Sequence, residues 1–310
     1  MSATKNRIYR LSRPAYVVSH LAAVVPSEEL DSVFLRYWLE NFNPTQLIQD
    51  SSYPSISQEH IESVSLFLPD LSEQKRIAGR LEQVDRLRRA RRYALELGDT
   101  FLPAAFRELF GDPIKNPAGF RTEQLEDLID PNRPISYGIL MPGPDVPGGV
   151  PYIRVTDIQN GKIISTSIRR TTVEIDQAYK RSKLKGGDLL MTIRGHVGRM
   201  AIVPPSLEGA NITQDTARLA PCNSVNAQYL MGCLGTDGMQ RRMADLTRGA
   251  AVQGINLGDV KELPIPVPPM PLQKKWGSLV SYADHLRSAQ REALRQADHL
   301  FQSLLDRAFR

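Results

Sequence analysis

The chain has 310 residues, enough for about two domains, and its net charge of +5 permits a nucleic-acid partner without requiring one. It has no apolar run near the roughly 20 residues that a membrane-spanning helix needs, and its basic first ten residues lack the apolar stretch of a secretory signal. Cys222 and Cys233 form no CxxC pair, which excludes a disulfide framework and is typical of a cytoplasmic protein.

The first element with a clear signal is an extended apolar run, Leu66-Phe67-Leu68, that ends at Pro69. Proline lacks the N–H and fixes φ, so we expect an edge strand or an extended lead-in here. A long helix is predicted over residues 71–110, with Ser72 as its capping side chain. Its apolar residues recur at spacings typical of a coiled-coil seam, and they are Ile77, Leu81, Val84, Leu95, Leu102, Ala105 and Leu109.

Two features of this helix need separate interpretation. Gly98 and Pro103 lie inside the apolar pattern and predict a kink or a break near them. A run of arginines either forms a solvated surface paired with Glu82, Asp85 and Glu96, or contacts DNA or a partner subunit, and the sequence does not decide between the two. The run consists of Arg86, Arg88, Arg89, Arg91 and Arg92.

The sequence pattern of residues 112–270 predicts a mixed α+β domain with a curled sheet. Gly111-Asp112-Pro113 ends the first helix, and short β-type runs separated by turns follow. Asn160-Gly161 and Gly195–Gly198 are the clearest turns. The predicted strands are Pro151–Ile158, Ile163–Ile168, Leu189–Ile193, Met200–Val203 and Thr213–Leu219, and the predicted helices are Tyr229–Leu234 and Gly238–Leu246.

The end of the chain repeats its beginning. Val260–Pro268 aligns with Ile61–Pro69 at an offset of 199 residues, and a second long helix is predicted over residues 271–310. Each long helix carries an apolar stripe without a partner nearby in sequence, so we expect the two to pack as an antiparallel pair. At the same offset Gln74, Lys75, Asp85, Leu87 and Phe110 match Gln273, Lys274, Asp284, Leu286 and Phe309.

Four stretches, which together cover nearly the whole chain, carry a resemblance to a known family. They are GVPYIRVTDIQNGKI at 149–163, LKGGDLLMTIRGHVGRMAIV at 184–203, NITQDTARLAP at 211–221, and the twice-present unit of strand, proline turn, glutamine and long helix. In this order they resemble the specificity (S) subunits of Type I restriction–modification enzymes. The resemblance implies an α+β fold in which a mixed-sheet target recognition domain is flanked by two long antiparallel, coiled-coil-like helices.

The resemblance also implies a role and a domain plan. The role is that of a DNA sequence-specificity subunit, without chemistry or cofactor of its own, that reads double-stranded DNA and scaffolds methyltransferase (M) and restriction (R) subunits. The plan is a partial first target recognition domain at 1–70, a spacer helix at 71–110, a complete domain at 112–270 and a second spacer helix at 271–310. The first domain is partial because counterparts of PYIRVTDI and GGDLLMTIRGHVG would fall before residue 1. Self-association and pairing with a second S-type chain both stay open.

Basic and polar side chains near glycine-containing turns are the candidates for DNA contact. Lys and Arg bind phosphates, side chains that reach base edges give specificity, and Gly195 and Gly198 would let the backbone approach a phosphate. A hairpin of solvated arginines is the alternative. The candidate DNA-binding residues are Tyr152, Arg154, Thr156, Arg194, His196, Arg199, Arg248 and Gln253.

The sequence offers no motif for catalysis or for a metal. It lacks a GxxxxGK[ST] loop and an Asn/Asp-Pro-Pro-aromatic tetrapeptide, and its five histidines do not have metal-ligand spacing. Pro69-Asp70 followed by Glu73-Gln74-Lys75 has the order of a nuclease motif, but its place at a helix start favours capping. Two other functions stay open: a truncated or silent recognition cassette, and a small stand-alone nuclease if the fold brings Asp188 and Asp215 together.

Overall fold

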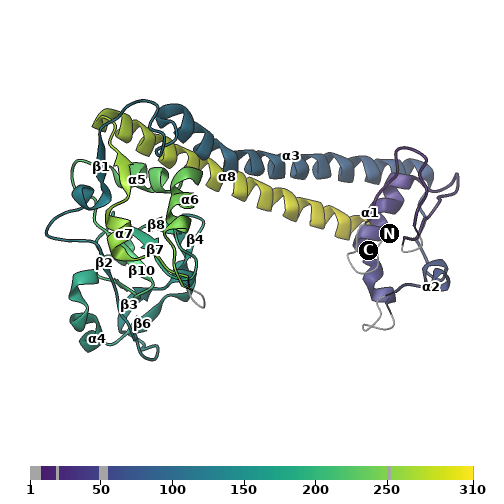
Figure 1. Cartoon of the computed structure of the whole chain (residues 1–310). Coiled ribbons are helices and arrows are strands. Elements are labelled where there is room, and N and C mark those ends of the chain that lie inside the picture. Colours follow the sequence, from purple (N-terminus) through teal and green to yellow (C-terminus); the bar gives the residue numbers. More distant parts are fainter. Residues whose placement is uncertain (1–7, 19–20, 49–54, 250–252, 310) are drawn as a thin grey trace. The chain divides into compact units, whose positions relative to one another are not determined.

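The computed structural model describes residues 8–18, 21–48, 55–249 and 253–309 and divides the chain into two compact units (Figure 1). The helical unit comprises Met1–Leu97 with Leu286–Arg310, and the central unit comprises Gly98–His285. Two long helices, α3 (Leu71–Phe110) and α8 (Met270–Ala308), contribute residues to both units. Helix α3 continues through Pro103, so the break that the sequence predicted there does not occur.

The helical unit contains α1 (Ser32–Phe42), α2 (Gln58–Glu62), the beginning of α3 and the end of α8. Its core is formed by Tyr37, Leu81, Phe301 and Leu305. Further along, Arg88 Nε donates to Asp298 Oδ1 at 2.7 Å. The contacting residues therefore have increasing numbers along α3 and decreasing numbers along α8. The two helices are antiparallel, as expected from the two apolar stripes.

The structure decides two local expectations at the start of α3. Of the two alternatives predicted for Leu66–Leu68, an edge strand or an extended lead-in, the strand does not form in the part of the chain that the structure describes, and Phe67 is 86% exposed. The matching segment of the central unit, β11 (Pro264–Pro266), pairs with β1 (Thr122–Gln124). The helix is capped by Asp70, whose Oδ1 accepts from the Glu73 backbone N–H at 2.9 Å and from the Ser72 hydroxyl at 2.6 Å.

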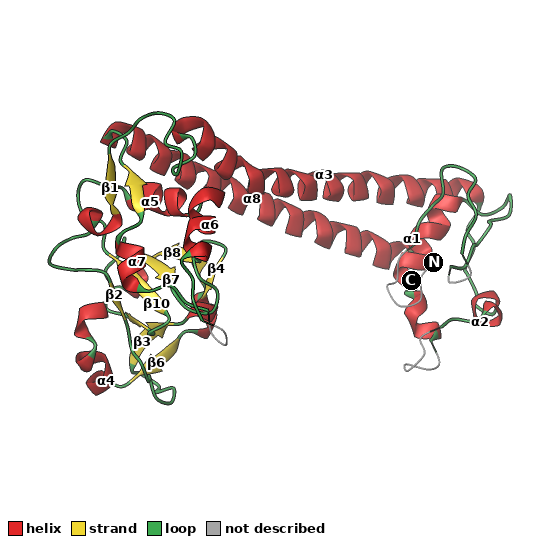
Figure 2. Cartoon of the chain, in the orientation of Figure 1, coloured by secondary structure: helices red, strands yellow, loops and turns green. Residues whose placement is uncertain are grey.

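The central unit is a mixed α+β domain built on short sheets (Figure 2). A four-stranded antiparallel sheet has the order β2-β10-β7-β8, and a three-stranded sheet has the order β6-β3-β9, with β3 and β9 parallel. Strands β1 and β11 form one pair and β4 and β5 another. The strands are β1 Thr122–Gln124, β2 Ser136–Tyr137, β3 Val150–Ile153, β4 Ile158–Gln159, β5 Lys162–Ile163, β6 Arg169–Thr171, β7 Leu189–Thr192, β8 Met200–Ile202, β9 Asn211–Ile212, β10 Thr216–Leu219 and β11 Pro264–Pro266. The shorter helices are α4 Val173–Ala178, α5 Ala227–Leu234, α6 Asp237–Asp245 and α7 Leu257–Lys261.

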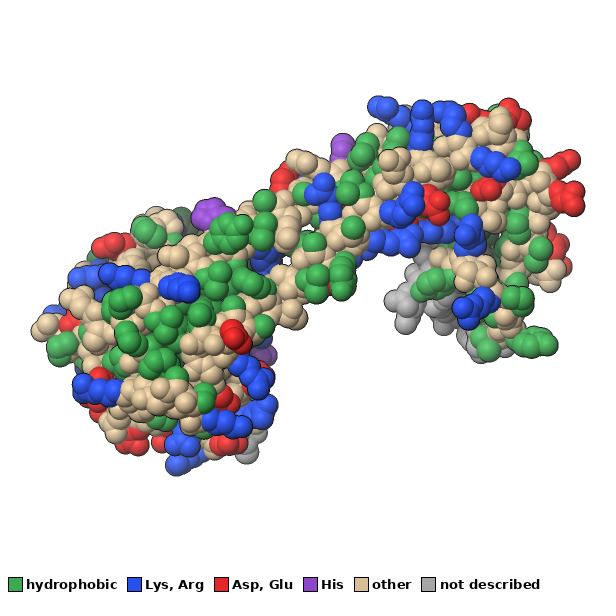
Figure 3. All heavy atoms as spheres, turned by 90° about the horizontal axis from the view of Figure 1, so that it is seen from above, with side chains coloured by type: hydrophobic (Ala, Val, Ile, Leu, Met, Phe, Trp, Pro, Cys, Tyr) green, Lys and Arg blue, Asp and Glu red, His purple; other side chains and the backbone are tan. Residues whose placement is uncertain are grey.

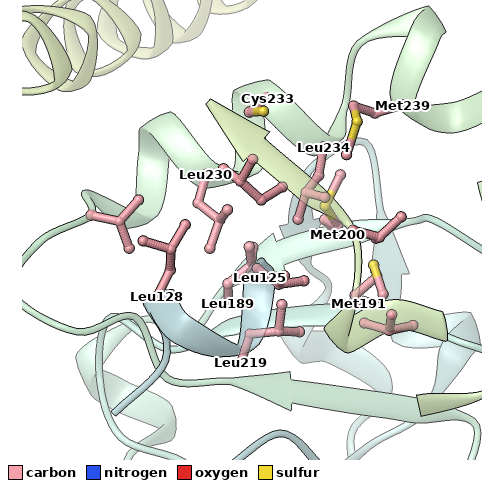
Figure 4. Packing of buried hydrophobic residues seen from close by; sticks show 14 of the residues in the cluster. Leu125, Leu128, Leu189, Met191, Met200, Leu219, Leu230, Cys233, Leu234 and Met239 are labelled. Carbon is pink, nitrogen blue, oxygen red and sulfur yellow. The ribbon is translucent and has the colours of Figure 1, made fainter. Parts of the chain in front are cut away.

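Both faces of the four-stranded sheet are covered. Leu189 and Met191 of β7 point into the main core beneath α5 and α6, where they meet residues such as Leu230 and Met239 (Figure 4). Leu190, between them, points into a second core on the other face. Side chains alternate along a strand, so a β7 that is buried at all four positions requires cover on both sides.

The hairpin predicted at Asn160-Gly161 forms, but over shorter strands than expected. Asn160 and Gly161 both have positive φ, and they connect β4 to β5. Upstream, a 3-10 turn at Val155–Asp157 interrupts the predicted strand Pro151–Ile158. Downstream, Arg169–Thr171 pairs with β3 instead of continuing the hairpin. Periodicity across residues 151–168 did not reveal this interruption.

The sequence repeat is also a repeat of local structure. Helix α1 in the helical unit and α5 in the central unit begin at the capping residues Asp31 and Asn226, whose side chains each accept from two backbone N–H groups. Phe34 of α1 meets Phe309 with ring centroids 5.2 Å apart, and Tyr229 of α5 meets Phe110 at 4.9 Å. Both pairs are edge-on, with interplanar angles of 65° and 64°. Phe110 and Phe309 are a matched pair of the 199-residue repeat.

Candidate nucleic-acid interface

The turn between β7 and β8 exposes three of the predicted DNA-binding residues, Arg194, His196 and Arg199. Gly195 and Gly198 have φ of 72° and 86°, a backbone conformation that favours glycine. The buried Thr192 hydroxyl holds the turn closed, because it accepts from the Arg199 backbone N–H at 2.9 Å and donates to the His196 carbonyl. The turn therefore projects its polar side chains outward from a fixed base.

A second loop lies against this turn and contributes two more predicted residues, Arg248 and Gln253. The Gly195 N–H donates to the Gln253 carbonyl at 2.9 Å, and the Ile255 N–H donates to the Ile193 carbonyl at 2.9 Å. Arg248 and Gly254 exchange two backbone hydrogen bonds of 2.9 Å each, which close the loop. Residues 250–252, at its tip, lie outside the described residues.

The loop approaches the turn closely at Gly254. A Cβ on Gly254 would lie 3.1 Å from Cγ of Arg194 and 3.2 Å from the Ile193 carbonyl oxygen. The result is a surface of five exposed side chains from two segments, which we call the polar surface; it consists of Arg194, His196, Arg199, Arg248 and Gln253.

Helix α6 supports the polar surface from below. Gln240 Nε2 donates to the Gly198 carbonyl at 3.1 Å and to the Leu234 carbonyl at 2.9 Å. A cavity of about 240 Å³ opens between this helix and the turn, lined by Gly195, Val197, Gln240, Ala244, Thr247 and Gln253. Gln240 and Thr247 are not among the residues predicted from the sequence, because nothing in a helical pattern shows which polar face meets a distant turn.

The cations of the polar surface have few acidic neighbours. Arg194 Nη1 donates to Gln214 Oε1 at 3.2 Å and lies 4.0 Å from Asp215 Oδ1, with its side chain half exposed. Among the described residues, no ion pair involves Arg199 or Arg248. Exposed, unneutralised guanidinium groups beside glycine turns are suited to contact phosphates and the acceptors of base edges.

Three predicted residues do not belong to the polar surface. Tyr152 is only 1% exposed, because β3 lies between β6 and β9 and its side chain enters the core. Arg154 is partly buried and holds Asp157 through bonds of 3.0 and 2.8 Å, which stabilises the 3-10 turn. That hydrogen bond, more than the burial that opposes it, raises the pKa of Arg154. Thr156 is exposed, but its described contact is a carbonyl that accepts from Gln159.

The carboxylates considered for a nuclease do not meet. Asp188 lies just before Leu189, at the end of the β7–β10 pair where Leu189 meets Leu219. Asp215 lies just before Thr216, at the end where Thr216 meets Thr192. The two acids therefore lie at opposite ends of the β7–β10 pair, on the order of 10 Å or more apart. Asp188 is instead buried against Arg133, with bonds of 2.7 and 2.6 Å. Within the described part of the chain, no group of three His, Cys, Asp or Glu residues could hold a metal ion.

The arginine run on α3 is engaged mainly in ion pairs. Arg88 and Arg89 both pair with the buried Asp85, and Arg88 also reaches Asp298 and lies over the Phe301 ring, 4.0 Å from its centroid. The sequence suggested Glu82, Asp85 and Glu96 as acidic partners, and Asp85 is the one that forms these ion pairs. Figure 3 shows basic, acidic and apolar side chains interleaved over the helices of the helical unit. The described helices include none that is long and apolar enough to cross a membrane.

Comparison with known proteins decides the family. The model of the Type I restriction modification DNA specificity domain matches residues 6–97 and 144–296, which is more than half of the chain. The chain belongs to this family. Its two matched segments each contain most of one copy of the repeat, including the matched pair Gln74 and Gln273.

A curated member of the family matches most of the chain. The specificity subunit of the Type I restriction enzyme EcoBI from Escherichia coli is 31% identical over 283 residues, which cover 82% of this chain and 60% of that protein. The chain thus spans less than two thirds of the length of this curated relative.

Solved structures support the fold. The HsdS subunit from Thermoanaerobacter tengcongensis superimposes with a TM-score of 0.51 at 21% identity, covering 91% of this chain and 71% of that one. The S subunit of a Type I restriction–modification system from M. genitalium gives 0.53 at 17% identity, covering 91% and 73%. The sequence resemblance to S subunits and the α+β fold class are therefore confirmed.

Proposed function

We propose that this chain is the DNA-reading subunit of a Type I restriction–modification complex and that the polar surface contacts the target. The observation that carries the proposal is the hydrogen-bonded junction of the 194–199 turn and the 248–255 loop, which brings five of the eight predicted residues onto one exposed surface. A fixed backbone with long polar side chains suits sequence readout, because base edges are recognised by precisely placed donors and acceptors.

The remaining parts of the proposal follow from family membership. The chain supplies no chemistry of its own, and M and R subunits bound to it in the cytoplasm perform methylation and cleavage. The paired helices α3 and α8 are the scaffold on which those subunits assemble. The two copies of the repeat have similar local structure, one around α1 and one around α5. Two similar structures suit the binding of two like partners, or of two copies of one partner.

The test is co-expression of the chain with its M subunit in a methylation-free host, followed by genome-wide mapping of methylated bases. We expect one defined motif, split by a fixed gap or palindromic if two copies assemble. The variants Arg194→Ala, His196→Ala and Gln253→Ala should relax or abolish the motif, while Arg121→Ala, an exposed arginine elsewhere in the central unit, should leave it unchanged. Methylation that needs only the M subunit, or that is absent, would favour the silent cassette instead.

A further inference from the structure

A second polar cavity lies at the far end of the same sheet. The 194–199 turn follows the C-terminal end of β7, whereas this cavity is lined by Ser136 of the edge strand β2 and by Arg218 of β10, which pairs with Leu190 of β7. Its volume is about 590 Å³, more than twice that of the cavity under the turn. It is lined by Asn132, Arg133, Pro134, Ile135, Ser136, Lys180, Arg181, Lys183, Leu184, Lys185, Glu208, Gly209 and Arg218.

The lining is strongly basic, with six Lys and Arg side chains against the single acidic residue Glu208. Two of the six have carboxylate partners: Arg133 lies 2.6 Å from Asp188, and Lys183 Nζ lies 2.9 Å from Asp176. Lys180, Arg181 and Lys185 are exposed at the mouth, and no ion pair neutralises them within the described residues. The cavity therefore holds an excess of positive charge.

Arg218 of β10 is the most buried cation of the lining, because it is only 1% exposed, and no carboxylate among the described residues forms an ion pair with it. Its Nη2 donates to the carbonyls of Pro134 and Arg181, both at 2.9 Å, which fixes the guanidinium in place. Its Nε and Nη1 have no hydrogen-bond partner in the part of the chain that the structure describes. A buried guanidinium stays charged, so unused donors on it are costly unless an anion or water meets them.

We propose that this cavity binds a phosphate group, with Arg218 as the buried donor and Lys180 and Lys185 as the cations at its mouth. Several donors of fixed direction around one volume suit a tetrahedral anion better than a single planar carboxylate. The volume exceeds that of a free phosphate ion, so it has room for a phosphate carried on a larger molecule or for the backbone of a nucleic acid. The proposal rests on no base contact and stands apart from the polar surface.

The first experiment measures phosphate binding by the full chain. Isothermal titration with sodium phosphate is compared with sodium chloride at matched ionic strength, for the wild type and for two variants. We expect saturable phosphate binding by the wild type, about threefold weaker in Lys180→Ala/Lys185→Ala and about tenfold weaker in Arg218→Met. Lys274→Ala/Lys275→Ala, which removes two exposed lysines from α8, is the matched control and should bind as the wild type does.

If Arg218→Met fails to fold, as circular dichroism would show, the lysine variant alone decides. Wild-type heats that match those of chloride would overturn the proposal, as would equal phosphate binding by the lysine variant and its control. Bound water on Arg218 is then the better explanation of its free donors.

A second measurement identifies the source of the phosphate. If DNA supplies it, Lys180→Ala/Lys185→Ala weakens binding of specific and random duplexes alike, and inorganic phosphate competes with both. If a free phosphate compound supplies it, duplex affinity is unchanged while the phosphate titration is still weakened. Because the phosphate titration contains no DNA, it can succeed even if the proposed role in target reading fails, and the methylation map can succeed when phosphate does not bind.

Discussion

Gln74 and Gln273, 199 residues apart, make the same hydrogen bonds in different units. Gln74 Oε1 accepts from the N–H of Asp31, the capping residue of α1, and its Nε2 donates to the carbonyls of Pro69 and Glu29. Gln273 Oε1 accepts from the N–H of Asn226, the capping residue of α5, and its Nε2 donates to the carbonyls of Pro268 and Ser224. Each fully buried amide thus joins a proline turn to the start of an earlier helix, α1 for Gln74 and α5 for Gln273.

This pair yields a prediction about stability. Gln273→Ala and Gln74→Ala should each lower the free energy of unfolding by about 2–3 kcal/mol, because each leaves buried backbone groups without partners. Hydrogen exchange should locate the loss at α5 for the first variant and at α1 for the second. Gln83→Ala, at an exposed position of α3, is the control; equal losses from all three would show that the amides are not structural.

The polar surface should contribute to DNA affinity mainly through charge. Arg248→Ala and Arg199→Ala should each weaken duplex binding and reduce the slope of log affinity against log salt by about 1, if each contacts one phosphate. Fluorescence anisotropy at several salt concentrations measures both quantities. Arg121→Ala is the control, since its exposed side chain is not part of the polar surface and pairs with Glu123. An unchanged salt slope in both test variants would remove them from the interface.

The turn itself should be sensitive to a single methyl group. Gly198→Ala places a Cβ 2.5 Å from Gln240 Oε1 at a φ of 86°, so we expect a cost of about 1–3 kcal/mol and weaker DNA binding. Gly258→Ala is the matched control, because that site in α7 has open space and an ordinary φ. Urea denaturation of the two variants tests this, and a Gly198→Ala protein as stable as Gly258→Ala would contradict the described turn.

Asp85 should make the helical unit sensitive to acid. Burial alone would raise the pKa of its carboxyl, but hydrogen bonds and charges from Arg89 and Arg36 outweigh burial and lower the pKa. A carboxyl whose folded pKa lies below its unfolded value stabilises the fold above the unfolded value, near 4, and loses that contribution as pH falls through the folded pKa. Asp85→Asn should therefore cost about 2 kcal/mol at pH 7 and flatten the decline of stability below pH 4.

Urea denaturation between pH 7 and 3 measures this dependence. Glu28→Gln, a change at an exposed carboxylate in the same unit, should keep the wild-type profile. An Asp85→Asn profile parallel to that of the wild type at low pH would show that this network does not govern acid stability.

The two cysteines should differ in reactivity. Burial raises the pKa of the Cys233 thiol to about 12, so almost none of it is thiolate at pH 8, whereas Cys222 is partly exposed. A thiol reagent such as DTNB should therefore label one cysteine in the native chain and two after denaturation. Cys222→Ser should bring the native count to zero, and rapid labelling of that variant would place Cys233 nearer the surface than the structure does.

Much of the fold could be predicted because its signals are local. Glycine and proline at Gly111 and Pro113 ended α3, and the turn at Gly195–Gly198 predicted the β7–β8 hairpin. The repeat predicted two paired helices before any contact was known. Where the sequence left alternatives, the deciding contact was distant: Leu66–Leu68 could be an edge strand or an extended lead-in, and among the described residues no strand pairs with it.

The interface was predictable only in part, for the same reason. Arg194 and Arg248 could be proposed because exposed arginines beside glycine turns are common at phosphates, but only the backbone bonds between the two loops bring them together. Tyr152 and Arg154 failed because pattern does not show that one enters the core and the other binds Asp157. The basic cavity escaped notice entirely, since Arg133, Lys180 and Arg218 come from three separate segments.

The order of the two units along the chain has a consequence for synthesis. The central unit is continuous over 98–285, while the helical unit needs Phe301, Leu305 and Phe309 to close on Tyr37 and Leu81. Within these 310 residues, the part of the helical unit that precedes the central unit can therefore close only after the central unit is complete. At about 5–20 residues per second, Leu81 waits on the order of ten to forty seconds for its partners. During that interval the apolar stripe of α3 is exposed beside the ribosome, where a chaperone would have to shield it.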